Sequence, residues 1–157
     1  MNAENPIAEL ALKRKNKFKD EEEIKNYLEK NKFFATWNES VKKEYQKNCF
    51  KKVVEGEEQF YSLKCDPIFE SNTFKNSNDF DFWDQLGLVN NEELVMLYSE
   101  RQDVFGKEHW EKVFSLINSK KKSLLMIPNS SHVIPYEYPE IISEHVLKLV
   151  HKNNSKL

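Results

Sequence analysis

The sequence predicts an α/β fold in which a helical region, residues 1–89, precedes a strand–helix–strand–helix unit, residues 90–151. Two short apolar runs, Leu94–Tyr98 and Leu124–Ile127, have the composition of strands that are buried on both faces of a parallel sheet. Between them, apolar residues recur at helical spacing, at Trp110, Val113, Phe114 and Ile117. Because a helix that crosses back over a sheet joins parallel strands, we expect the two runs to pair in parallel.

Several segments of the helical region begin with residues suited to start a helix. The expected starts lie at Asn5, Asp20, Asn38 and Asp66, and a proline follows Asn5 and Asp66. Asp20 and Glu23 also have the spacing of a capping box, and Glu58–Lys64 is expected to form a brief extended segment. Each of these helices has few apolar positions and needs another surface to cover, so we interpret the region as a cap or lid.

A small polar turn, Pro128–Ser131, follows the second apolar run and leads to His132. Open α/β sheets bind their ligands at the carboxyl ends of the strands, so His132 lies where a reaction site is expected. Histidine is also the side chain that most often acts in general acid–base catalysis. His132 is therefore the candidate catalytic residue, and Pro139 is expected to begin the final helix after it.

The order of strand, polar turn, His132, apolar pair and Glu-x-Pro-Glu resembles the histidine segment of the α/β-hydrolase family. The whole chain resembles the second half of that fold, with cap helices before the last two parallel strands, their crossover helix and a C-terminal helix. The Asn-Pro opening, Leu10–Lys15 and Ser62–Ser71 look like the cap of fungal peroxisomal serine hydrolases of the lipase or esterase type. The resemblance implies a partial α/β-hydrolase fold, a Ser-His-acid triad with His132 as general base, and a small apolar ester as substrate.

The chain departs from this family at the nucleophile. The family places its serine in a G-x-S-x-G turn, whereas the glycines of this sequence are Gly56, Gly87 and Gly106, of which no two are four residues apart. The chain is therefore expected to be the C-terminal portion of a hydrolase and to be inactive without the other half. The same scarcity of glycine excludes a P-loop and a dinucleotide-binding turn.

The acid of the triad has more than one possible source. Many members of the family carry it in a Gly-x-x-Asp turn after the penultimate strand, and this pattern would place it at Gln102. Asp103 follows one residue later and is the candidate orienter of His132 in this chain. Other members take the acid from the preceding strand, which would lie outside the 157 residues.

The composition of the chain excludes several classes of partner. The net charge of −2, with lysine runs alternating with acidic segments, argues against a nucleic-acid partner, and no apolar run is long enough to span a membrane. Cys49 and Cys65 have neither zinc nor disulfide-framework spacing, and no pattern indicates a metal or another cofactor.

Residues 152–157 form a polar tail that ends in Ser155, Lys156 and Leu157. These three residues are the signal that the peroxisomal import receptor reads, so the sequence predicts a peroxisomal matrix protein.

Two other functional classes remain open at this point. One is a non-catalytic peroxisomal interaction protein derived from a hydrolase, which would use the exposed edge of a two-strand sheet to associate with a partner. The other is part of an epoxide hydrolase or dehalogenase, in which an aspartate replaces the serine as nucleophile. His132 would be essential in the enzymes and dispensable in the interaction protein.

Overall fold

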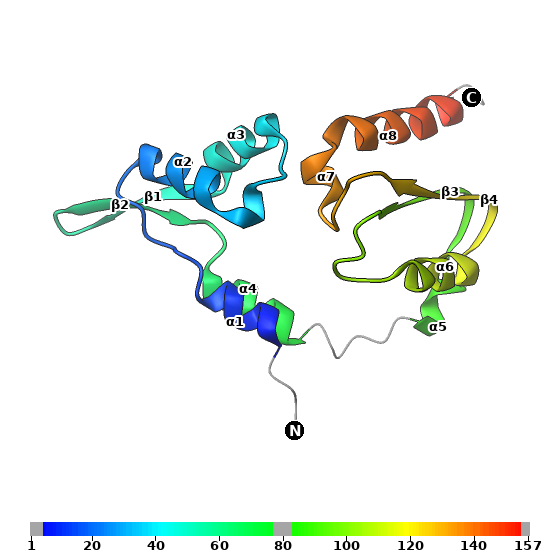
Figure 1. The fold of residues 1–157 in the computed structure, drawn as a ribbon, viewed down its shortest axis with the longest axis horizontal. Helices are drawn as coiled ribbons and strands as arrows, with labels where there is room; N and C mark the ends of the chain where they lie inside the picture. The colour runs from blue at the N-terminus through cyan, green and yellow to red at the C-terminus, as the bar shows by residue number, and fades with distance from the viewer. Residues whose placement is uncertain (1–4, 77–82, 155–157) are drawn as a thin grey trace. The chain divides into compact units, whose positions relative to one another are not determined.

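The structure is a computed structural model that describes residues 5–76 and 83–154 (Figure 1). The chain forms two units, Met1–Asp81 and Phe82–Leu157. Helices and an antiparallel hairpin make up the first unit, and a parallel two-strand sheet with helices makes up the second. The α/β fold class is therefore confirmed, and the strand–helix–strand–helix arrangement predicted for residues 90–151 lies within the second unit.

The first unit contains the predicted helices. Their bounds are Pro6–Leu12 for α1, Glu21–Lys30 for α2, Glu39–Asn48 for α3 and Pro67–Asn76 for α4, with a short 3-10 helix, η1, at Lys32–Phe34. At all four expected starts a side-chain oxygen accepts a hydrogen bond from a backbone N–H in the first turn. The capping box at Asp20 differs in one detail, because the Glu23 carboxylate accepts from the N–H of Lys19 and not from that of Asp20.

An antiparallel hairpin joins α3 to α4. Strand β1, Phe50–Glu55, pairs with β2, Glu58–Leu63, so that Glu55 lies opposite Glu58. Gly56 is the first of the two loop residues and has a φ of 61°, which a type II′ turn requires at that position. The extended segment predicted at Glu58–Lys64 is confirmed as β2, and β1 is an additional strand.

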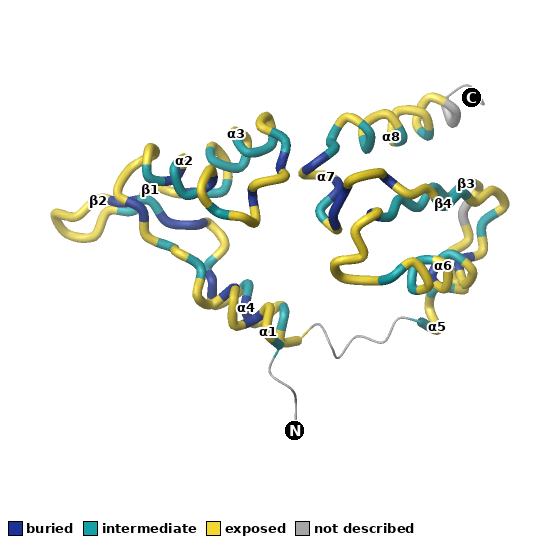
Figure 2. Tube along the Cα trace, in the orientation of Figure 1, coloured by how far each residue is buried: buried dark blue, intermediate teal, exposed yellow. Residues whose placement is uncertain are grey.

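Aromatic rings form much of the buried core of the first unit. The buried stretches of its backbone are dark blue in Figure 2. Phe18 and Phe34 are almost fully buried, and Phe34 packs edge-on or tilted against four rings, those of Tyr27, Phe33, Trp37 and Tyr45. Phe18 exchanges two backbone hydrogen bonds with Tyr61, at 2.9 and 2.7 Å, which attach the segment before α2 to the hairpin. The core thus lies between α2, η1, α3 and the start of the hairpin.

A half-buried ionic cluster connects three helices of this unit. The guanidinium of Arg14, just after α1, binds the carboxylate of Glu70 on α4 and donates to the hydroxyl of Tyr45 on α3 at 3.0 Å. Burial acts to lower the pKa of Arg14, but the interactions with Tyr45 and Glu70 outweigh it and raise that pKa. Arg14 therefore stays a cation, and the cluster fixes the end of α1 against α3 and α4.

The second unit confirms the predicted crossover. Its elements are α5, Trp83–Leu86; β3, Asn90–Ser99; α6, Lys107–Leu116; β4, Asn118–Ile127; α7, Ile134–Glu137; and α8, Pro139–Asn154. Strands β3 and β4 are parallel, with Met96 opposite Leu124 and Ser99 opposite Ile127, and α6 connects them. Pro139 is the first residue of α8, as expected, whereas the short helix α7 was not predicted.

The expectation that both strands are buried is wrong for this chain. Leu125 and Met126 in β4 are 37% and 42% exposed, and the apolar residues of β3 are only half-buried. Val146, Leu147 and Val150 of α8 are also exposed. The physical reason is that the described residues contribute only two strands to this sheet, too few to be covered on both faces.

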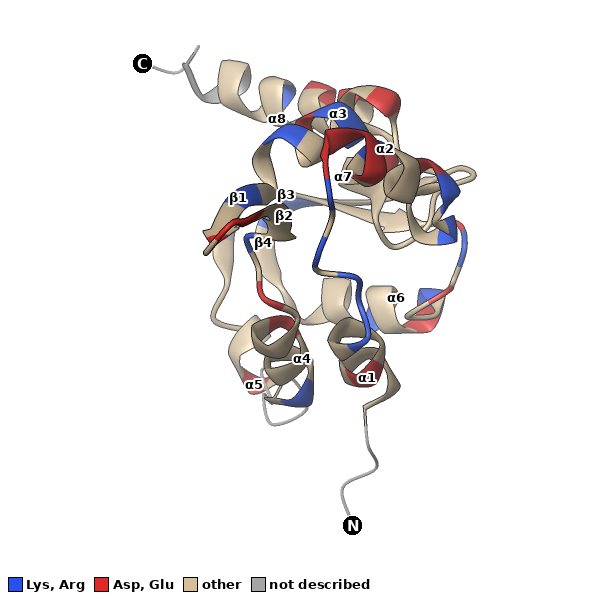
Figure 3. Ribbon diagram, turned by 90° about the vertical axis from the view of Figure 1, so that its left-hand side faces the viewer, with Lys and Arg blue, Asp and Glu red and all other residues tan. Residues whose placement is uncertain are grey.

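Charge is mixed in both units. Basic and acidic residues both occur in each unit (Figure 3). In the described part of the chain, residues 5–76 and 83–154, no helix is long and apolar enough to cross a membrane. The import signal predicted at Ser155, Lys156 and Leu157 lies outside the described residues.

Candidate active site

The carboxyl ends of β3 and β4 bring Asp103 and His132 together. Because Ser99 and Ile127 are partners in the parallel register, the loops that follow them leave the sheet at the same edge. Nδ1 of His132 lies 2.7 Å from Oδ2 of Asp103, and the backbone N–H of His132 donates to Oδ1 of Asp103 at 3.2 Å. Both oxygens of one carboxylate thus hold the same histidine, through its ring and its main chain.

The two loops are also linked directly to each other. The N–H of Arg101 donates to the carbonyl oxygen of Ser130 at 3.0 Å, and its guanidinium donates to that of Asn129 at 3.0 Å. In the opposite direction, the N–H of Asn129 donates to the carboxylate of Glu100 at 2.6 Å. Asn129 adopts a left-handed φ of 56°, a conformation that asparagine tolerates better than most residues. These bonds fix the turn before His132 relative to the loop that carries Asp103.

The segment on the amino-terminal side of His132 is buried and hydrogen-bonded. Ser130 is fully buried and donates its hydroxyl to the carbonyl oxygen of Ile127 at 2.7 Å. Ser131 donates its N–H and its hydroxyl to the two carboxylate oxygens of Glu137, at 2.6 and 3.0 Å. Sequence reasoning missed Glu137, which it treated only as part of the Glu-x-Pro-Glu pattern before the last helix.

Both side chains of the site are partly exposed to solvent, and their contact lowers the pKa of Asp103. The side chains of His132 and Asp103 are 46% and 35% exposed. Partial burial acts to raise the pKa of Asp103, but the hydrogen bonds from His132 outweigh it and hold that pKa below its ordinary value. An ionised Asp103 accepts a hydrogen bond from the Nδ1–H of His132, which leaves Nε2 as the ring nitrogen that can take a proton from a reactant.

The lowered pKa of Asp103 makes the stability of the second unit depend on pH. The folded pKa lies below the unfolded one, so the ionised carboxylate contributes stability above about pH 4 and loses it as the pH falls through the folded pKa. We expect the free energy of unfolding to fall more steeply with acidification in the unmodified chain than in Asp103→Asn. Urea unfolding in steps between about pH 6 and pH 2.5 measures this difference.

An exposed aspartate elsewhere in the second unit provides the control. Asp84 lies in α5, and Asp84→Asn is expected to follow the acid profile of the unmodified chain. Parallel profiles for the unmodified chain and Asp103→Asn would contradict the assignment of this pH dependence to the contact between Asp103 and His132.

The described residues hold a histidine and an aspartate in contact, with one ring nitrogen of the histidine left over. Within them, Nε2 of His132 makes no hydrogen bond, and a G-x-S-x-G turn is absent from the sequence. Nor do the described residues contain a group of three or more His, Cys, Asp or Glu side chains that could hold a metal ion. Chemically, this arrangement can accept and return a proton at Nε2.

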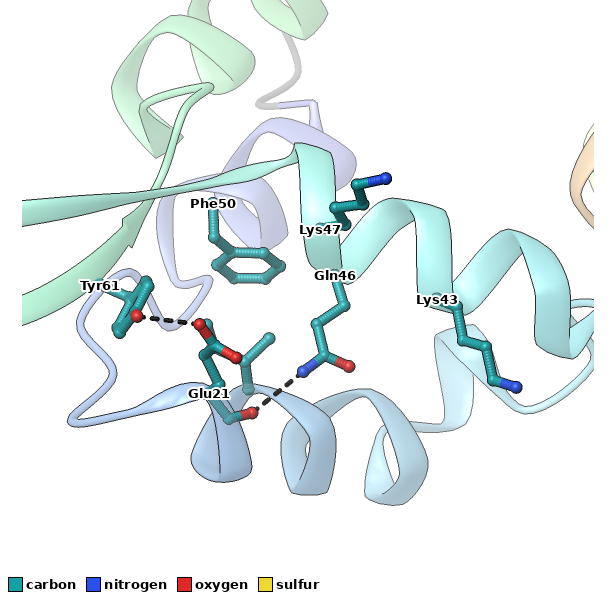
Figure 4. Close-up of a pocket in the computed structure, with 7 residues that line it drawn as sticks. Glu21, Lys43, Gln46, Lys47, Phe50 and Tyr61 are labelled. Atoms are coloured by element: carbon teal, nitrogen blue, oxygen red, sulfur yellow. Dashed lines mark hydrogen bonds between the residues drawn. The ribbon is translucent and has the colours of Figure 1, made fainter.

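A separate pocket of about 310 Å³ lies in the first unit (Figure 4). Its lining residues come from α2, α3 and the hairpin and are Glu21, Ile24, Lys43, Gln46, Lys47, Phe50 and Tyr61. The hydroxyl of Tyr61 donates to the carboxylate of Glu21 at 3.0 Å, and the side chain of Gln46 donates to the main-chain oxygen of Glu21 at 3.1 Å. The Lys43 and Lys47 ammonium groups point away from these bonds (Figure 4). The polar groups of Glu21, Gln46 and Tyr61 therefore bond to one another, and we assign the pocket no ligand.

The second unit is a parallel β–α–β arrangement with an acid–histidine pair at its strand ends, and the fold of the chain corresponds to part of an α/β-hydrolase fold. Among solved structures, the chain is similar to the peroxisomal alpha-beta-hydrolase Lpx1 from Saccharomyces cerevisiae, with a TM-score of 0.75 and 15% sequence identity. The similarity covers 100% of this chain and 42% of that chain, so the chain spans less than half the length of its structural neighbour. A scan against protein-family models and a search of curated proteins found no match.

Proposed function

We propose that this chain supplies the cap and the histidine-bearing part of a serine hydrolase that cleaves carboxylic esters. The observation that carries the proposal is the 2.7 Å contact between Nδ1 of His132 and Oδ2 of Asp103 at the ends of two parallel strands. A histidine held by a carboxylate on one nitrogen and free on the other is the base–acid half of a Ser-His-acid triad. The similarity to a known α/β hydrolase supports the fold on which this role depends.

In this mechanism His132 moves one proton in each direction. Nε2 accepts the proton of a serine hydroxyl while the serine oxygen attacks the ester carbonyl, and the imidazolium then protonates the departing alkoxide. Water repeats the sequence on the acyl-enzyme, which releases the acid and regenerates the serine. Asp103 stabilises the imidazolium in each half-reaction, and the serine belongs to polypeptide outside these 157 residues, which alone are inactive.

The compartment and the class of substrate are part of the same proposal. The final Ser155-Lys156-Leu157 and the peroxisomal compartment of the structural neighbour support import into the peroxisomal matrix through the import receptor. Exposed apolar side chains on α1 and α4, among them Leu10, Ile68 and Phe69, support a cap that faces an apolar ester.

Labelling of the nucleophile tests this proposal. The natural polypeptide that carries this sequence is isolated from its host and treated with a fluorophosphonate, which reacts with activated serines, and the modified residue is located by mass spectrometry. We expect one labelled serine outside the 157 residues, with labelling lost in His132→Ala. An ester intermediate on an aspartate would replace the serine mechanism with that of an epoxide hydrolase or dehalogenase. An unlabelled protein whose cellular role survives His132→Ala would be a non-catalytic interaction protein.

A further inference from the structure

Glu137 is a buried carboxylate that the proposed mechanism does not use. It is 7% exposed and lies at the end of α7, six residues after Ser131. A carboxylate that leaves water loses its hydration and is stable inside a protein only when hydrogen bonds replace it. Both oxygens of Glu137 receive such bonds from Ser131, at 2.6 Å from the N–H and 3.0 Å from the hydroxyl.

The hydrogen bonds around Ser131 extend to both sides of the histidine. The hydroxyl oxygen of Ser131, which donates to Glu137, also accepts from the N–H of Val133 at 3.4 Å. The N–H of His132 itself donates to Asp103 at 3.2 Å. The backbone N–H groups of residues 131, 132 and 133 therefore each donate a hydrogen bond to a side-chain oxygen. Two of these three bonds depend on Glu137, one directly and one through the hydroxyl of Ser131.

We propose that Glu137 is a positioning residue for His132, because its carboxylate fixes Ser131 and so places the imidazole ring on Asp103. Glu137 bonds to the N–H and the hydroxyl of Ser131, the residue before the histidine, and in this way acts on the imidazole through the main chain that carries it. The consequence for catalysis rests on the proposed function, whereas the effect on the contact between His132 and Asp103 does not. A misplacement of about 1 Å at a reacting group costs roughly 100-fold in rate, so this support matters for the reaction.

A graded set of substitutions separates this role from a general loss of stability. Glu137→Ala removes both acceptors, Glu137→Gln retains one carbonyl oxygen for the N–H of Ser131, and Ser131→Ala removes only the hydroxyl. Glu144→Ala is the matched control, because Glu144 is an exposed glutamate of α8 that pairs with Lys148. The set is made in the natural polypeptide that carries this sequence.

The first measurement is the proton NMR signal of the Nδ1–H of His132, which moves far downfield when it is shared with a carboxylate and is assigned by its loss in His132→Gln. We expect the signal to disappear in Glu137→Ala, to weaken in Ser131→Ala and to be largely retained in Glu137→Gln and Glu144→Ala. The second is steady-state ester hydrolysis, for which we expect kcat to fall about 10- to 100-fold in Glu137→Ala at unchanged KM, with partial recovery in Glu137→Gln.

The outcomes distinguish the positioning role of Glu137 from the proposed hydrolase function. A folded Glu137→Ala protein with the native Nδ1–H signal would overturn the positioning role. If Glu137→Ala does not fold, Ser131→Ala decides, and an unchanged signal and kcat in that variant would overturn the role equally. Loss of the signal in Glu137→Ala together with hydrolysis that does not require His132 would refute the proposed function and leave the positioning role standing.

Discussion

Under the proposed function, replacement of His132 by alanine is expected to lower kcat for ester hydrolysis by about 10⁴- to 10⁶-fold. Without the imidazole, no group on these two strand ends can take the serine proton during attack and return it to the leaving group. The contact at 2.7 Å with Asp103 holds the ring in one orientation, and truncation to alanine removes this oriented base altogether. In the proposed mechanism the imidazole acts on the serine proton and not on substrate binding, so KM is expected to change little.

Asp103→Asn is expected to lower kcat by about 10³- to 10⁴-fold, less than loss of the histidine. An asparagine amide can present its NH₂ group to Nδ1, which favours the wrong tautomer and removes the charge that stabilises the imidazolium. The double variant with His132→Ala is expected to be no slower than His132→Ala alone, because the two residues act as a unit. Measurement of kcat for all three variants and for His145→Ala, a control on α8, would contradict the triad if losses at residues 103 and 132 were additive.

Local signals explain why the helix starts could be predicted from the sequence. An N-cap such as Asn5 or Asp20 bonds to an N–H only two or three residues away, so its partner is visible in the sequence itself. The same holds for Pro139, whose fixed φ suits the first turn of α8. The parallel pairing of β3 and β4 followed from the helix between them, because the crossover leaves few other topologies.

The sequence did not predict the elements that form only through contacts with distant parts of the chain. Strand β1 contains Lys51 and Lys52 and has little apolar alternation, so its pattern resembles a solvated surface until the type II′ turn at Gly56 brings it against β2. The short helix α7 is too brief to show a helical period. Burial of the apolar strands was overestimated because it depends on neighbouring strands that the described residues do not contain.

The candidate site was predicted in part for the same reasons. His132 follows a strand and a polar turn, a local pattern, whereas its partner comes from a loop 29 residues away. The spacing typical of the α/β-hydrolase family pointed to Gln102, but the conformation of the loop after β3 brings the carboxylate of Asp103 to Nδ1. Glu137 stood out in the sequence only as the first glutamate of Glu-x-Pro-Glu, and its role depends on the fold of α7, which brings it to Ser131.

The largest expected effect on stability is at Phe34. Its ring is 1% exposed and lies with its centroid 4.9 to 5.9 Å from those of Tyr27, Phe33, Trp37 and Tyr45, so Phe34→Ala leaves a cavity that these rigid rings cannot close. We expect the free energy of unfolding of the first unit to fall by about 3–5 kcal/mol. Typical domains are stable by only about 5–15 kcal/mol, so the variant would be close to unfolding.

Phe33→Ala is the matched control for this prediction, because Phe33 is the preceding residue and has the same side chain. It touches the rings of Phe34 and Trp37 but is 55% exposed, so its truncation leaves a surface notch that water fills. We expect a loss of about 1 kcal/mol or less, as for other exposed positions. Urea unfolding gives the total change, and amide hydrogen exchange in α2 and β1 localises it to the first unit. Equal losses for the two variants would mean that the ring cluster is not the core on which the first unit depends, and that burial of Phe34 contributes no more than an exposed contact does.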